Sequence, residues 1–485
     1  MKFYLPATLL ILVLAVAPGL QAQEDAWKAQ MQAASEWLKQ ANTEQAWTSF
    51  KGALEAAEKF GPQDPRLAST LEFVGAFLSS QGQFSQAESL LERALAIRER
   101  IHGPEHPAVA DSLDGLAKLF QAQGRAAEAE ECLRRALAVR EKAYGREHAL
   151  VDASLNRLAV FFDGRGRYEE AEAFFRRSLE LRQSALGAED PRVAAAMNNL
   201  GVIHHKQDKV TEAETLLKRA WEIRERRFGL QHLDTDDSIN SLAAVYRDAG
   251  RLEEAERLFA LSLSIRENLL SRQNPLDPRL AAGLRDLAGV RLARKKYAES
   301  QPLLERVLVI EQELLGADHP MLVATLSDLA RAGLNQGHYK ESEQLLRRAL
   351  KIQEAASGPE HVNITATLNT LAEVYARQDL PGQAVPLLKR SQAILEHSGP
   401  EWRLHLAATL DMLGRMHMAQ QAHAEAEPCF ERSLELAQQS LGEDHPLVAE
   451  ILEHYAGLLR LTQRSGQADS MAARAEAIRA RQSSR

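Results

Sequence analysis

A 42-residue period dominates the sequence. Glycine recurs at this spacing at positions 61, 103, 145, 187 and 229, and, after three additional residues near Ser271–Asn274, at 316, 358 and 442. Each period contains two amphipathic helical patterns, as in Gly187–Phe228, joined by a weakly helical turn. A single pair of such helices cannot bury its own apolar face. The fixed period therefore predicts an all-α solenoid of stacked helix-turn-helix hairpins.

Two columns of small residues support this register. The middle of the first helix in each period carries only Gly or Ala: Gly75, Ala117, Ala159, Gly201, Ala243, Ala288, Ala330, Ala372, Gly414 and Ala456. Twelve positions later the column holds only Ala or Ser: Ala87, Ala129, Ala171, Ala213, Ala255, Ser300, Ser342, Ala384, Ala426 and Ala468. Close helix crossings require small residues, because a larger side chain would push the two helices apart.

These motifs resemble the tetratricopeptide repeat, whose first helix reads L-G/A-x-x-Y/F before the two later small positions. Leu200-Gly201, Glu212-Ala213-Glu214 and the link Gly103–Pro107 are similar to the kinesin-light-chain type of that repeat, over about residues 61 to 485. The resemblance implies a right-handed superhelix in which the first helices line a concave face. It also implies binding of short, extended peptides, with an aromatic residue flanked by acids as one preference.

The expected organisation has three parts. Residues 1–22 have the pattern of a secretory signal peptide, with Lys2, an apolar core that is short for a membrane span, and a small residue at Ala22. Residues 23–60 form a helical lead-in, and residues 61–485 form about ten repeats. The repeats start near residues 61, 103, 145, 187, 229, 274, 316, 358, 400 and 442. The insertion before residue 274 is either a longer loop or a division of the array into halves.

Composition and motifs argue against several functions. The net charge of −8 disfavours nucleic acid as a partner. Cys132 and Cys429 lie seven repeats apart, without metal-ligand spacing, and are interpreted as packing residues. No arrangement of nucleophile, base and orienting group is present, so we expect neither an enzyme nor a cofactor.

One histidine or aspartate precedes the first helix of nearly every repeat. The histidines are His106, His148, His232, His319, His361 and His445, and the aspartates are Asp64, Asp190 and Asp277. A metal site is one interpretation. Because His alternates with Asp before Pro or a small residue, the pattern favours helix N-caps, with no metal bound.

A polar column three residues before the Gly/Ala column is the candidate binding surface. It consists of Glu72, Asp114, Asn156, Asn198, Asn240, Arg285, Ser327, Asn369, Asp411 and Glu453. The resemblance implies that it faces the groove, where amides hold a peptide backbone. The candidate groove residues are the amides Asn156, Asn198, Asn199, Asn240 and Asn369, and the basic residues Lys118, Arg157, Arg247, Arg331 and Arg415, which would bind carboxylates. The alternative is a solvated face without a ligand.

The sequence therefore predicts a non-catalytic scaffold that binds a protein or an extended peptide in its concave groove. The alternative is a structural adaptor of an envelope complex that binds through its edges or convex face. The signal pattern predicts export to the periplasm or secretion, with no stable membrane insertion after cleavage. An uncleaved N-terminal anchor is the other possibility for that segment.

Overall fold

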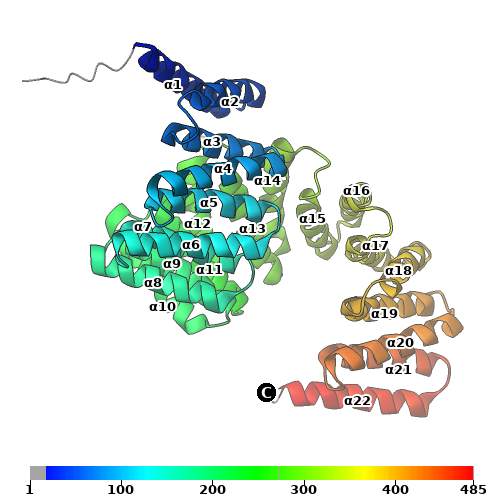
Figure 1. Cartoon of the computed structure of the whole chain (residues 1–485). Helices are drawn as coiled ribbons and strands as arrows, with labels where there is room; N and C mark the ends of the chain where they lie inside the picture. The colour runs from blue at the N-terminus through cyan, green and yellow to red at the C-terminus, as the bar shows by residue number, and fades with distance from the viewer. Residues whose placement is uncertain (1–17, 272–273, 484–485) are drawn as a thin grey trace, which may run out of the picture. The chain divides into compact units, whose positions relative to one another are not determined.

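The computed structural model describes residues 18–271 and 274–483, and this part of the chain is all α-helical apart from two short 3-10 helices (Figure 1). The all-α prediction is confirmed. Residues 1–17 of the expected signal segment lie outside the described residues, and residues 18–22 begin the first helix.

The helices pair as consecutive hairpins in two compact units, which divide at Arg227/Phe228. Unit 1 contains α1(Pro18–Lys39), α2(Thr43–Glu58), α3(Pro65–Ser80), α4(Phe84–His102), α5(Pro107–Ala122), α6(Ala126–Tyr144), α7(Ala149–Asp163), α8(Tyr168–Leu186), α9(Pro191–Lys206) and α10(Val210–Phe228).

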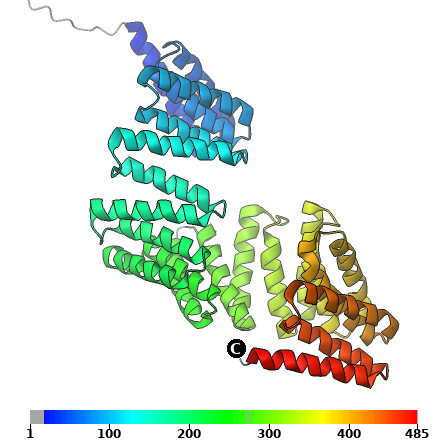
Figure 2. The ribbon, with the colours of Figure 1, turned by 60° about the horizontal axis from the view of Figure 1, so that its bottom comes forward.

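Unit 2 contains the remaining helices. They are α11(Leu233–Asp248), α12(Leu252–Leu270), α13(Pro278–Ala293), α14(Tyr297–Leu315), α15(Leu322–Gln336), α16(Tyr339–Ser357), η1(Val362–Ile364), α17(Thr365–Arg377), α18(Pro381–Glu396), η2(Pro400–Trp402), α19(Arg403–Ala419), α20(His423–Leu441), α21(Pro446–Leu461) and α22(Ser465–Ser483). Figure 2 shows the stacking of successive hairpins within each unit.

The insertion near residue 274 lies inside unit 2. Helices α12 and α13, which flank it, pack directly on each other, and the boundary between the compact units lies at Arg227/Phe228. A change in the pitch of the superhelix at the insertion stays a prediction.

The links between repeats end one helix and start the next. Gly187 follows α8 with φ +83°, a left-handed conformation that favours glycine, and its N–H donates to the Gln183 carbonyl at 3.0 Å. Three residues later, the Asp190 carboxylate accepts from the N–H of Arg192 at 2.8 Å and Pro191 occupies the first helical position. The predicted start of this helix is confirmed.

The small columns lie where the helices of each hairpin cross. Ala213 and Ala220 have no exposed surface. A Cβ built on Gly201 would lie 2.8 Å from Cγ of Leu217, on the second helix of the same hairpin. Such a contact is too short for carbon atoms, so the close approach of Leu217 leaves room only for glycine at position 201.

Residues 18–58 form a complete hairpin of α1 and α2. Trp27 Nε1 on α1 donates to Thr70 Oγ1 on α3 at 2.8 Å, and Trp47 on α2 stacks on Phe77 with ring centroids 5.9 Å apart. These contacts join the segment that precedes Gly61 to the first regular repeat, so that the stack of hairpins begins at α1.

Candidate functional site

The polar column lies at junctions between repeats. On α5, Asp114 accepts from Arg140 of α6 at 2.6 Å, and the same guanidinium donates to Ser154 Oγ of α7 at 2.7 Å. The three residues join a first helix, its own second helix and the next first helix. They are well buried, since the side chains of Arg140 and Asp114 are only 4% and 9% exposed. A buried charge pair of this kind needs such additional hydrogen bonds to offset its desolvation.

The same junction recurs with opposite charges between α13 and α14. Arg285 stands in the column position of Asp114, and it pairs with Glu311, which stands in the position of Arg140. Thr325 of α15 donates to Glu311 at 2.7 Å, as the counterpart of Ser154. The column is therefore a structural element of the repeat interface in addition to its candidate role in binding.

Four of the predicted amides lie in this column and Asn199 lies next to it, and all five are partly buried. In unit 1, Asn199 Nδ2 donates to Asn156 Oδ1 at 3.4 Å, whereas the buried Oδ1 of Asn198 has no hydrogen-bond partner among the described residues. In unit 2, Asn240 accepts from Ser262 Oγ at 3.4 Å, and Asn369 Nδ2 donates to Thr409 Oγ1 at 2.8 Å.

The two units separate the three consecutive amides. Asn156 and Asn198 belong to unit 1 and Asn240 belongs to unit 2. Asn156, Asn240 and Asn369 bond to polar groups on other helices of their own unit. Their role in holding a peptide backbone stays a prediction.

Four of the five predicted basic residues pair with an acid nearby. The pairs are Arg157 with Asp114 at 2.9 Å, Arg247 with Asp248 at 2.7 Å, Arg331 with Asp328 at 2.8 Å and Arg415 with Asp411 at 3.2 Å. Lys118 is exposed and has no ion pair or hydrogen bond within residues 18–271 and 274–483. A carboxylate ligand would meet an unpaired cation at Lys118 and would compete with an internal acid at the four arginines.

A groove of about 680 Å³ is lined by residues of four successive repeats of unit 2. Its lining is mostly apolar and comes mainly from the starts of the first helices α15, η1–α17 and η2–α19 and the links before them, together with residues of α13, α14 and the end of α16. The lining includes Met321, Val323, Ala324, Val362, Ala366, Trp402 and His405. A concave, mostly apolar surface with a few polar groups is typical of binding sites.

The two ends of the groove differ in chemistry. At one end, the Met321 side chain is 58% exposed, and the Arg285–Glu311 pair also lines the groove. At the other end, the rings of Trp402 and His405 contact each other, with centroids 5.0 Å apart and planes inclined by 59°. An aromatic edge at one end and a charge pair at the other would give a bound segment a direction.

None of the ten predicted site residues lines this groove, although Arg285 of the polar column does. Two signals in the sequence point to it. Trp402 replaces the usual His or Asp of the link, and Ala282, Ala324, Ala366 and Ala408 form a column of small residues three positions before the polar column. Small residues at an exposed position leave room for a ligand, but only the structure shows that adjacent columns enclose a groove.

The histidines of the links cap helices. Nδ1 of His106 accepts from the N–H of Ala108 at 3.2 Å, and the other five make the same bond two residues ahead. The N-cap interpretation is confirmed for five of the six, whereas α15 has Met321 as its N-cap and His319 caps the turn before it. Within the ranges that the structure describes, no group of three or more His, Cys, Asp or Glu side chains is placed to hold a metal ion.

Both cysteines are free and half-buried, Cys132 in unit 1 and Cys429 in unit 2. Burial raises the pKa of the Cys132 thiol to about 11 and also raises the pKa of Cys429. Because the thiolate is the reactive form, both side chains are poor nucleophiles near neutral pH. Separately, no helix among the described residues is both long and apolar enough to cross a membrane.

A family model of the tetratricopeptide repeat matches most of the chain. The matches span residues 29–100, 66–142, 114–184, 150–220, 192–268, 279–355, 334–397 and 405–481. The protein therefore belongs to the tetratricopeptide repeat family, as the resemblance indicated. The first match includes α2 and the second half of α1, in agreement with the complete hairpin at the start of the stack.

The chain is also similar to several solved structures. The nearly identical TPR-like repeats of a putative kinesin light chain from Podosopora anserina are 26% identical, cover 43% of this chain and 99% of their own, and give a TM-score of 0.39. BtubC (BKLC) from P. vanneervenii is 25% identical over 51% of this chain and 92% of its own, with a TM-score of 0.37. The apo form of RapI is 15% identical over 60% and 99%, with a TM-score of 0.46. No curated protein sequence matches the chain.

Proposed function

We propose that this protein is a non-catalytic scaffold that binds an extended segment of a partner protein in the groove formed by α15, α17 and α19. The observation that supports this most directly is the groove itself, which is mostly apolar and is lined by residues of four successive repeats. Tetratricopeptide repeats generally serve protein interaction, so the proposal also agrees with the family.

The dimensions of the groove favour an extended segment. Adjacent helices pack on the order of 10 Å apart, so two steps from one repeat to the next span roughly 20 Å, the length of about six residues in an extended chain. Apolar side chains of the segment would contact Met321 and Val362, and an aromatic or aliphatic residue would pack on Trp402. Burial of such side chains contributes about 25 cal/mol for each Å² removed from water.

The test is affinity capture with matched variants of the full chain. Met321→Ser combined with Trp402→Ala removes the apolar surface at both ends of the groove. Val309→Ser is the control, because Val309 is 57% exposed on α14 and does not line the groove. We expect the double variant to lose partners that the wild type and the control retain.

A triple variant tests the amides. If Asn156→Ala, Asn198→Ala and Asn240→Ala together abolish the capture that the groove double variant retains, the binding surface lies along the amide column instead. Retention of the same partners by every variant would overturn the groove and favour the adaptor, which binds through an edge or the convex face.

We further propose that the scaffold acts outside the cytoplasm, in the periplasm or after secretion. The support is the signal-peptide pattern of residues 1–22. Mass spectrometry of the N-terminus of the native protein tests it: an N-terminus close to residue 23 in an exported fraction is expected, and an intact Met1 on membrane-bound protein would indicate an uncleaved anchor.

A further inference from the structure

One hairpin of unit 2 has no side chain at a position where the others carry a large one. Three residues after the Gly/Ala column of the first helix, six of the ten repeats carry a ring and three carry another large side chain: Phe120, Phe162, His204, Tyr246, Tyr375 and His417, and Leu78, Arg291 and Leu459. On α15 this position is Gly333. A glycine in the interior of a helix costs about 1 kcal/mol relative to alanine, so that its presence needs a reason.

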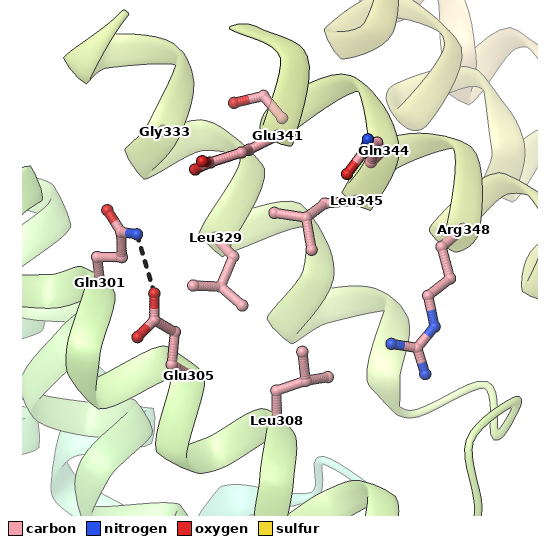
Figure 3. A pocket seen from close by; sticks show the side chains of 10 residues that line it. Gln301, Glu305, Leu308, Leu329, Gly333, Glu341, Gln344, Leu345 and Arg348 are labelled. Atoms are coloured by element: carbon pink, nitrogen blue, oxygen red, sulfur yellow. Dashed lines mark hydrogen bonds between the residues drawn. The ribbon is translucent and has the colours of Figure 1, made fainter. Parts of the chain in front are cut away.

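The missing side chain leaves a pocket of about 360 Å³. Figure 3 shows Leu308, Leu329 and Leu345 around the same space, one each from α14, α15 and α16. Gly333 lies at its edge. A dry apolar cavity of about 150 Å³ in another protein is enough to bind benzene, so this pocket has room for a substituted ring.

The next repeat shows how such a space is filled. Tyr375 is 2% exposed, and its hydroxyl donates to Glu343 at 2.7 Å and accepts from Arg347 at 2.8 Å. These partners precede Tyr375 by 32 and 28 positions. The residues that precede Gly333 by the same intervals are Gln301 and Glu305.

Both of these residues line the pocket. Gln301 Nε2 donates to Glu305 Oε1 at 2.9 Å, the bond drawn in Figure 3, and this is the one hydrogen bond of the Glu305 carboxylate within the described residues. A carboxylate offers about four lone-pair sites, so Glu305 can accept a further hydrogen bond. The pocket thus combines an apolar interior with a hydrogen-bond acceptor, Glu305. In the next repeat, the corresponding position is occupied by a partner of the Tyr375 hydroxyl.

We propose that the pocket beside Gly333 binds a phenol ring, inserted between α14 and α16 with its hydroxyl donating to Glu305. The ring belongs either to a small phenolic molecule or to a tyrosine side chain of a partner. The site lies between the second helices α14 and α16, beside the first helix α15, and is separate from the proposed groove, since the two share no lining residue.

The structure provides a variant that closes the pocket. A Cβ at Gly333 would lie 2.7 Å from Ser342 Oγ, whereas Tyr375 is accompanied by Ala384 at the position of Ser342. Gly333→Tyr should therefore be combined with Ser342→Ala. Ser342→Ala alone is the matched control, because it keeps the pocket open.

The experiment is a calorimetric titration of the full chain with p-cresol. Wild type and the Ser342→Ala control are expected to bind, and the double variant is expected to bind at least ten-fold more weakly and to melt at a higher temperature. Glu305→Met should lower the preference for p-cresol over toluene by about ten-fold, because the hydroxyl loses a charged acceptor. Equal binding by the double variant and wild type, or no binding by wild type, would overturn the proposal.

Two further arms complete the test. If N-acetyltyrosinamide competes with p-cresol, the pocket accepts a tyrosine side chain; if p-cresol binds and the tyrosine derivative does not, the pocket takes a free phenol. Should the double variant fail to fold, crystals of the wild type with 4-bromophenol decide the matter. Anomalous density for bromine between α14 and α16 supports the site, and density elsewhere alone overturns it.

Discussion

Hairpins α5–α6 and α13–α14 place opposite charges at the same two positions. In the first, an acid on the first helix, Asp114, meets Arg140 on the second helix; in the second, Arg285 meets Glu311. Each pair spans 26 positions, and a hydroxyl of the next repeat bonds to the residue on the second helix. The repeat geometry therefore specifies the two positions of the charge pair, but it does not specify which helix carries the acid and which carries the arginine.

The two pairs also differ in exposure. Arg140 and Asp114 are both nearly enclosed, whereas Arg285 is 41% exposed and only its partner Glu311, at 6%, is buried. When both charges of a pair are buried, removal of one leaves the other without a partner to offset its desolvation cost. We expect the first pair to be more sensitive to substitution.

The largest effect is expected for Arg140→Ala. It leaves Asp114 with only Arg157 as a charged partner and removes the bond to Ser154, so that the free energy of unfolding should fall by about 3–5 kcal/mol. Chemical denaturation measures it. Arg93→Ala, which breaks the exposed pair with Glu58, is the control and should cost less than about 1 kcal/mol. Equal losses in the two variants would contradict the comparison.

A smaller effect is expected for Arg285→Ala, about 1–3 kcal/mol, because Glu311 stays buried but keeps its bond from Thr325. Exchange of both charges, Arg285→Glu with Glu311→Arg, should recover part of the loss. Hairpin α5–α6 already carries an acid on its first helix and an arginine on its second helix at these two positions. A double-mutant cycle from denaturation midpoints measures the coupling, expected to be about 0.5–3 kcal/mol. Zero coupling would mean that the two side chains act independently.

A slight effect is expected for Arg157→Ala. This side chain is 42% exposed, and Asp114 retains Arg140 when it is removed, so that the loss should be below about 1 kcal/mol. The same denaturation assay applies. If Arg157→Ala lost as much stability as Arg140→Ala, the exposed Arg157 would stabilise Asp114 as much as the buried Arg140 does, which would contradict the comparison.

The last prediction concerns a third pair in the same column, Glu72 with Arg98 at 2.5 Å. Burial raises the pKa of Glu72 above 4.5, against the lowering effects of Ser112 and Arg98. Between pH 4.5 and that raised pKa the folded protein holds a proton that the unfolded chain has lost. Its contribution to stability is thus full below pH 4.5 and is lost as the pH rises through the folded pKa.

Glu72→Gln removes this titration and keeps an acceptor for Ser112. The difference in unfolding free energy between wild type and Glu72→Gln should decline as the pH rises from 4.5 and level off above the folded pKa. Denaturation at a series of pH values tests it, and a difference that is constant from pH 4 to 8 would refute the raised pKa.

Much of the fold could be predicted from residues that act locally. Gly187 ends one helix and Asp190 starts the next, each through a hydrogen bond to a residue within four positions. Ala213 marks the buried crossing of the two helices that recurs in every repeat. Repetition strengthened each of these inferences, because the same position could be read in successive periods. The break between units at Arg227/Phe228 had no such signal and was not predicted.

The candidate site was predicted less completely. The polar nature of the column was visible, but its partners lie 26 or 40 positions away on other helices, so the pairing of Asp114 with Arg140 and of Asn369 with Thr409 was not predicted. The groove was missed because its lining comes from four repeats. Trp402 was visible as an irregular residue, and its place at the end of a groove was not.

The sequence by itself determined that this chain is a stack of tetratricopeptide hairpins, because a fixed period of apolar, small and capping residues specifies the same local structure each time. The tertiary structure decided which surfaces are available. Whether the Gly333 position opens a pocket, and whether a polar column pairs internally or faces a ligand, depends on side chains that meet only when repeats stack. The local interactions that form each hairpin recur along the chain, whereas the pocket and the groove arise where neighbouring repeats carry different side chains.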